Sequence, residues 1–185
     1  PRGLGVGRRL TRQSTMRLRT VPGAALLLVL LILLSAASAQ LQPVPDDDPD
    51  LARGWAAYQA REVPAAVTYF LKAAERNQRV AQFNLAVILL SGDGVAADPP
   101  QGLAWLRRAA DNDLARAQYT LGALLEQGRH LPRSLPEATA WYEKAAGQGW
   151  RAAQLAVATQ YYLGRGVARD YAAAARWYER AAEQG

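Results

Sequence analysis

Residues that could perform catalysis or bind a metal are scarce in this chain of 185 residues. Beyond residue 39 there is one histidine, His130, and there are two serines, Ser91 and Ser134; cysteine is absent. A serine hydrolase needs its serine, its histidine and a third orienting group to converge, and the sequence indicates neither the third group nor the convergence. One histidine cannot form a histidine cluster, and without cysteine there are no disulfides, thiol chemistry or Cys-based metal sites. We therefore expect no enzyme, no cofactor and no metal site.

The acidic run Asp46-Asp47-Asp48-Pro49-Asp50 is the densest group of carboxylates in the chain. Carboxylate oxygens are calcium ligands, but the run lacks a calcium-binding loop motif, and calcium binding stays an alternative only. It lies in a Pro-rich stretch, and polar, charged segments of this kind remain solvated. We interpret residues 40–50 as a flexible acidic linker.

A third group of chemically suggestive residues is a series of aromatic side chains. They recur every 36 residues, at Tyr69, Trp105, Trp141 and Trp177. One interpretation is an aromatic cage for a ligand, which requires rings from successive units to converge. The other is core packing, in which each ring fills the space beside a pair of small residues one turn further on. We favour packing, because a regularly spaced aromatic residue in a stacked array usually belongs to the core.

The small residues have the same period as the aromatic ones. Alanine pairs follow at 73–74, 109–110, 145–146 and 181–182, with no insertion between them. A unit of 36 residues accommodates two helices and two turns, and the apolar spacing within each half is helical. The sequence thus predicts an all-α fold, a right-handed α-solenoid of about four helix-turn-helix repeats. The predicted solenoid covers residues 51–185, in units of about 51–78, 79–114, 115–150 and 151–185.

The turns and helix starts of this pattern have identifiable residues. Glycines that can adopt a positive φ should end the first helix of a pair, namely Gly92, Gly94, Gly164 and Gly166. In the unit between them His130 takes the place of the second glycine, where it tolerates positive φ better than bulky residues do. The second helices should begin after the N-caps Asp98, Ser134 and Asp170. The first two read as capping boxes, completed by Gln101 and Glu137.

The full pattern A-x-x-x-L-G-x-x-Y-x-x-G-x-G-V-x-x-D-x-x-x-A-x-x-W-x-x-x-A-A-x-x-G resembles the Sel-one-like repeat (SLR) family of the tetratricopeptide repeat superfamily. The best copy is residues 153–185, and the copy from Ala81 is nearly as good. The copy from Ala117 departs at His130 and Leu131. The first unit has a shorter turn and is similar to a tetratricopeptide-like opening unit.

The resemblance implies a recognition scaffold with a groove lined by the first helix of each pair. Eight positions on those helices fall outside the stacking set and are the expected partner-binding residues, with packing between repeats as the alternative: Phe83, Val87, Tyr119, Ala123, Glu126, Leu155, Thr159 and Tyr162. The expected partner is a protein or peptide, in envelope signalling or in exopolysaccharide or cell-wall assembly. Cysteine-rich relatives suggest a β-lactam-binding or hydrolysing enzyme as an alternative, which the lack of cysteine weakens.

The first 39 residues have the features of a secretory signal peptide. A basic start at residues 16–19 precedes an apolar run of 11 residues at 24–34 and small residues before Gln40. A membrane-spanning helix needs about 20 apolar residues. We therefore expect residues 16–39 to be a signal peptide cleaved after Ala39, and residues 1–15 to lie upstream of the true start at Met16. An uncleaved, membrane-anchored form is the alternative. Because the array stops at Gly185 without a capping helix, we expect the natural chain to continue.

Removal of this segment changes the charge of the chain. The chain has 22 basic and 16 acidic residues, and six of the basic but none of the acidic residues lie in the first 39. The rest is formally neutral and has no basic stripe, which argues against nucleic acid as a partner. The sequence therefore predicts an exported, periplasmic or secreted, adaptor that meets the membrane only through its signal segment.

Overall fold

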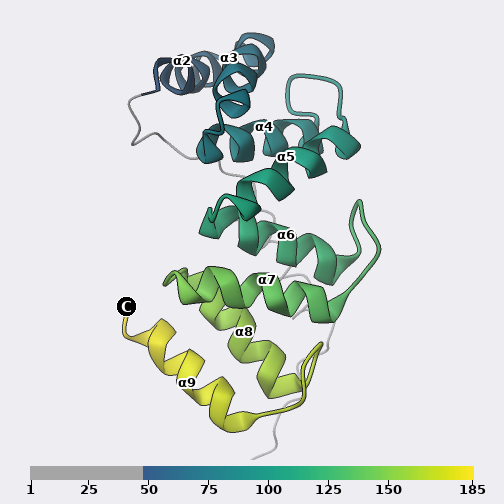
Figure 1. The fold of residues 1–185 in the computed structure, drawn as a ribbon, viewed down its shortest axis with the longest axis vertical. Helices are drawn as coiled ribbons and strands as arrows, with labels where there is room; N and C mark the ends of the chain where they lie inside the picture. Colours follow the sequence, from purple (N-terminus) through teal and green to yellow (C-terminus); the bar gives the residue numbers. More distant parts are fainter. Residues whose placement is uncertain (1–47) are drawn as a thin grey trace, which may run out of the picture. The chain divides into compact units, whose positions relative to one another are not determined.

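The computed structural model describes residues 48–185, and the regular structure of that part is entirely helical. Its eight helices are α2 (Pro49–Gln59), α3 (Val63–Glu75), α4 (Arg79–Ser91), α5 (Pro99–Asp111), α6 (Ala115–Gln127), α7 (Leu135–Gly147), α8 (Arg151–Leu163) and α9 (Tyr171–Ala182) (Figure 1). Each helix packs against its neighbours in sequence, so the helices form a solenoid of four pairs. The predicted all-α solenoid is confirmed. We call α2, α4, α6 and α8 the A helices and the others the B helices.

The expected signal peptide and its cleavage point at Ala39 and Gln40 lie outside the described residues. No helix within residues 48–185 has the length and apolar character needed to cross a membrane.

The first described helix begins earlier than the sequence predicts. α2 starts at Pro49, and its N-cap Asp48 accepts hydrogen bonds from the backbone N–H groups of Asp50 (2.9 Å) and Leu51 (3.2 Å). The Arg76 guanidinium lies 2.8 Å from the Asp48 carboxylate and 2.9 Å from that of Asp50. The expectation of a solvated linker up to residue 50 is therefore wrong at its end, because two of its carboxylates fasten α2 to the end of α3.

The predicted chain reversals are present. Gly92, Gly128 and Gly164 end the A helices in the left-handed conformation, with φ of 71°, 69° and 67°. Gly166 has φ of 75°, and His130 adopts the same conformation at φ of 64°. The turn that carries a histidine instead of the second glycine thus keeps the geometry of the others.

The B helices begin as predicted, but not all of their caps form. Asp98 accepts a hydrogen bond from the Gln101 N–H at 3.0 Å, and Asp170 accepts one from the Ala173 N–H at 2.9 Å. Ser134 occupies the N-cap position of α7 without a side-chain cap hydrogen bond. The prediction of a Ser134 capping box is therefore wrong, and α7 begins with a proline in its first turn instead.

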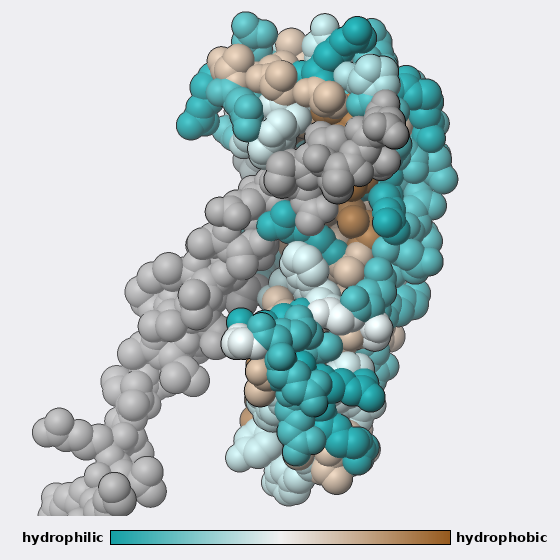
Figure 2. All heavy atoms as spheres, turned by 90° about the vertical axis from the view of Figure 1, so that its left-hand side faces the viewer, coloured by the Kyte–Doolittle hydropathy of each residue, from teal (hydrophilic) through white to brown (hydrophobic). Residues whose placement is uncertain are grey.

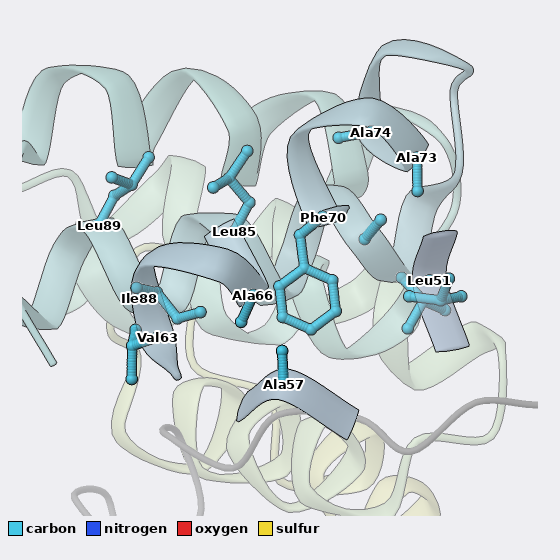
Figure 3. Packing of buried hydrophobic residues seen from close by; sticks show 12 residues of the cluster. Leu51, Ala57, Val63, Ala66, Phe70, Ala73, Ala74, Leu85, Ile88 and Leu89 are labelled. Atoms are coloured by element: carbon cyan, nitrogen blue, oxygen red, sulfur yellow. The ribbon is translucent and has the colours of Figure 1, made fainter. Parts of the chain in front are cut away.

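The buried position on the B helices lies one residue after the predicted one. The first three alanine pairs are buried, as expected, whereas in the last pair Ala181 is buried and Ala182 is exposed. Trp105, Trp141 and Trp177, however, are only half-buried, as is Tyr69. The fully enclosed side chains are those directly after the first three of these aromatic residues, Phe70, Leu106 and Tyr142. Figure 3 shows the Phe70 ring pointing toward Ala57 inside the first core cluster. Tyr69 and Trp105 pack against this cluster from outside, so the interpretation of the recurrent aromatic residues as core residues is corrected to half-buried packing beside the core.

Consecutive repeats are also joined by a buried glutamine. The Gln118 side-chain nitrogen donates to the carbonyl oxygen of Ala110 and to the Asp113 carboxylate, both at 3.1 Å. Its amide oxygen accepts a hydrogen bond from Gln148, 30 residues later, at 2.8 Å. Gln82 repeats this arrangement with the Asn77 amide oxygen in place of the carboxylate, whereas Gln154 keeps the bonds to the Ala146 carbonyl oxygen and from Gln184. The glutamine side chain thus donates a hydrogen bond to a backbone carbonyl oxygen that lacks a partner within its own helix, at the ends of α3, α5 and α7.

Candidate functional site

The eight predicted partner-binding residues occupy equivalent positions on three A helices. We call this surface the A-helix face: Phe83, Tyr119 and Leu155, then Val87, Ala123 and Thr159, then Glu126 and Tyr162. Exposure rises along the chain. Phe83 on α4 is fully buried, Tyr119 on α6 is half-buried, and Leu155 on α8 is 40% exposed. Of the middle set, Ala123 is buried and the other two residues are half-buried. The packing alternative therefore holds for Phe83 and Ala123.

Glu126 joins three elements of the fold. It accepts hydrogen bonds from the Tyr142 hydroxyl at 2.8 Å and from the Gln160 side chain at 3.0 Å, and Arg165 approaches it at 3.5 Å. Tyr142 in turn lies against Tyr119, with 5.4 Å between the ring centroids. Burial, followed by the charge of Glu126, raises the pKa of Tyr142 far above its ordinary value, so that this phenol stays protonated. Glu126 thus has a structural role in linking α6, α7 and α8.

The large hydrophobic side chains that remain exposed in residues 48–185 all belong to the last repeat. They are Leu155, Tyr162, Leu163, Tyr171 and Tyr178. Tyr162 and Tyr171 form an edge-to-face pair at 5.4 Å. Tyr178 is 41% exposed, whereas Tyr142, its equivalent one repeat earlier, is 2% exposed. Their equivalents one repeat earlier are covered to different degrees: Tyr142 is buried, Tyr119, Glu126 and Leu135 are half-buried, and Gln127 is exposed.

A charged residue outside the predicted set also lies among A-helix residues. Arg116, in the first turn of α6, places its guanidinium 5.7 Å from the ring centroid of Phe83 and 6.0 Å from that of Trp150. It is half-buried and forms no ion pair within the described residues. Burial lowers the pKa of Arg116. Sequence reasoning missed it, although it departs from the repeat, which has Val80 and Ala152 at the equivalent positions.

Figure 2 shows a face of the molecule on which hydrophilic residues form the margins and a few hydrophobic ones are visible between them. A cleft of about 270 Å³ is lined by residues of the B helices α5 and α7 and of the A helix α6, Trp141 among them. Its lining comes from α5, α6 and α7: Arg107, Asp111, Leu121, Leu125, Glu137 and Trp141.

The recurrent aromatic residues do not form a cage. Each ring instead has a cation three residues further along its own helix. The Lys144 nitrogen lies 3.7 Å from the Trp141 centroid, and the Arg108 guanidinium lies 4.8 Å from that of Trp105. No contact joins two of these recurrent rings within the part of the chain that the structure describes.

The residues considered for catalysis lie at helix ends (Ser91 and Ser134) and in a turn (His130), and they are not brought together. Ser91 donates to the Ile88 carbonyl oxygen and accepts from the Asp93 N–H. His130 accepts a hydrogen bond from the neighbouring Arg129. No hydrogen bond joins His130 to either serine in residues 48–185, and in the same residues no three His, Cys, Asp or Glu side chains are grouped as metal ligands.

Comparison with known proteins agrees with this architecture. The family model described as Sel1 repeat matches residues 61–78, 79–114, 115–150 and 151–185. A Sel1 repeat protein from Oxalobacter formigenes is 38% identical, with a TM-score of 0.61 over 63% of this chain and 87% of that one. A protective antigen of uropathogenic Escherichia coli with an SLR fold is 30% identical, with a TM-score of 0.70 over 85% of this chain and 33% of its own longer chain.

Cysteine-rich protein B of Helicobacter pylori has the same fold at 22% identity, with a TM-score of 0.51 over 72% of this chain and 90% of that one. No curated protein sequence matches significantly. Stacked repeats of this kind are typical of scaffolds for protein–protein interaction. The four matched repeats cover more than half of the sequence, and the chain belongs to the Sel1 repeat family.

Proposed function

We propose that this chain is an exported scaffold that binds a protein or peptide partner across its A-helix face. The observation that carries the proposal is the exposure of Leu155 and Tyr162 on α8, at 40% and 53%; the Tyr162 ring also packs edge-to-face against Tyr171. Exposed aromatic and aliphatic side chains that cluster on a folded surface are characteristic of protein-binding sites. Repeat solenoids present such surfaces to extended or helical segments of other proteins. Roles in envelope signalling or in exopolysaccharide or cell-wall assembly follow from the family resemblance.

Site-specific photo-crosslinking in the producing cell tests the binding surface. A photoreactive residue is placed at Leu155 or Tyr162, and the control is Ala140, which is exposed on the B helix α7. We expect one crosslinked protein band at both A-helix positions and none at residue 140. Equal crosslinking at all three positions, or none at 155 and 162, contradicts the proposal. Turnover of a chromogenic β-lactam by the purified protein contradicts a purely scaffolding function.

Export is tested separately by the intact mass of the cell-derived protein. We propose that the exported protein begins at Gln40. An N-terminal glutamine can cyclise and block N-terminal sequencing, so a blocked N-terminus does not contradict the proposal. If the measured mass still includes residues 24–34, the signal segment is uncleaved and the protein is a membrane-anchored adaptor.

A further inference from the structure

The surroundings of Arg116 offer hydrogen-bond donors without an acceptor. The Arg116 Nε and the Trp150 Nε1 are both buried, and neither has a hydrogen-bond partner within residues 48–185. Buried donors in native proteins are nearly always paired, so two such groups beside one another call for an explanation. The guanidinium between the Phe83 and Trp150 rings has aromatic contacts, which do not satisfy its N–H groups.

Within residues 48–185, no carboxylate forms an ion pair with Arg116. The ion pairs of the described residues use Arg53, Arg76 and Arg165. Removal from water alone accounts for the lowered pKa of Arg116, with no neighbouring carboxylate acting in the other direction. A cation that has lost part of its hydration and has no counter-ion binds an anion more strongly than a fully solvated one does.

Stacking of the repeats does not require this cation. Val80 on α4 and Ala152 on α8 occupy the equivalent position, and both are compatible with the same helix packing. Trp150, which precedes α8, likewise stands where Gln78 and Leu114 precede α4 and α6. The combination of a guanidinium with an indole N–H is therefore specific to the middle of the array, which is where a partner on the A-helix face would pass.

We infer that Arg116 and Trp150 bind a carboxylate of the partner, the side chain of an aspartate or glutamate in a bound protein segment. This rests on the proposed scaffold function and specifies the chemistry of the partner. A planar guanidinium binds a carboxylate through parallel N–H donors, and the indole N–H adds a third donor. Residues 40–185 contain equal numbers of basic and acidic residues. A single cation suits one carboxylate, whereas nucleic acids and anionic membranes need many.

NMR of the purified protein tests the carboxylate site directly. The probe is acetyl-glutamate amide, and acetyl-glutamine amide and inorganic phosphate serve as comparisons. We expect saturable shifts of the Arg116 Nε–H and Trp150 Nε1–H resonances with the glutamate probe only. R116V, which introduces the residue that α4 has at this position, should abolish the Trp150 shift. The control is R151A, because Arg151 is the first residue of α8 and α6 has an alanine, Ala115, at that position. This variant should leave the Trp150 shift unchanged. Equal shifts with the glutamine probe, or shifts with phosphate alone, overturn the inference.

Crosslinking at Leu155 separates this inference from the proposed function. With a carboxylate-bearing partner, R116V should weaken capture about tenfold, as expected for loss of a charge-assisted hydrogen bond, while R151A should not. If R116V leaves capture unchanged, the scaffold function stands and the carboxylate site is wrong. If crosslinking fails but the glutamate-specific shift is present, the proposed function fails and the site remains.

Discussion

Replacement of Tyr142 by alanine should destabilise the solenoid more than replacement of its neighbour Trp141, although tryptophan is the larger residue. Tyr142 is 2% exposed, its ring lies 5.4 Å from that of Tyr119, and its hydroxyl donates to Glu126 at 2.8 Å. Truncation of a fully buried aromatic residue costs about 3–5 kcal/mol of unfolding free energy. Trp141 is half-buried and rests under Lys144, so we expect its truncation to cost about 1–2 kcal/mol.

Denaturant unfolding followed by circular dichroism measures both costs on one scale. Repeat arrays can unfold in segments, so hydrogen exchange of α6, α7 and α8 should accompany it and should show the largest loss of protection for Y142A. Y142F retains the ring and isolates the hydrogen bond to the Glu126 carboxylate, at about 1.5–3 kcal/mol. If W141A costs as much as Y142A, the assignment of the core to the residue after each tryptophan is refuted.

Three further predictions concern pH, the buried amides and the turns. Because the pKa of Tyr142 is raised in the folded state, its contribution to stability is complete below the ordinary tyrosine pKa of about 10 and is lost as the pH rises above that value. The unfolding free energy should therefore fall less steeply with pH in Y142F than in the parent protein over this alkaline range. An unchanged slope would contradict the raised pKa. Q118L removes both donations from a buried amide and should cost about 1–3 kcal/mol in denaturant unfolding, clearly more than Q148A, which removes only the outer bond; equal costs would contradict this. H130G removes the steric cost of a left-handed non-glycine residue and should raise the unfolding midpoint or leave it unchanged, with a gain of at most about 1 kcal/mol of unfolding free energy. A marked loss of stability would show that the imidazole does more than form the turn.

The turns and the alanine pairs could be predicted from the sequence because their requirements are local and recur. A left-handed residue at the end of a helix favours glycine, and the positions of Gly92 and Gly164 follow directly, whereas Arg61 adopts this conformation after α2. Ala109 and Ala110 are small because another helix approaches them closely, and small size is visible in the sequence. A period of 36 residues then places the helices from α3 to α9, whereas α2 begins only 30 residues before α4 and does not follow the period.

The core could not be predicted as well, because two adjacent apolar residues in a helix point about 100° apart and the sequence does not say which one faces inward. The recurrent tryptophan is the more conspicuous of the two, whereas the true core position varies from Phe70 to Leu106 and Tyr142. That variation is matched on the opposing helix. A Cβ on Gly122 would lie 2.8 Å from the Tyr142 ring, so the large residue at one position requires a glycine at the other. Gly54 and Phe70 form a similar pair in the first unit, where the two residues are 16 positions apart instead of 20.

Departures from the repeat are the positions at which this chain can differ in function from other solenoids of the same fold. Residues that recur every 36 positions are accounted for by stacking, since each has the same neighbours in every unit. Arg116 replaces a small apolar residue and Trp150 replaces a leucine or glutamine, and the two meet across helices that the sequence separates by more than 30 residues. Other repeats stack with different residues at both positions, and both side chains have a donor without a partner in residues 48–185. A partner that supplies the missing acceptor would therefore be selected by these two residues and not by the repeat itself.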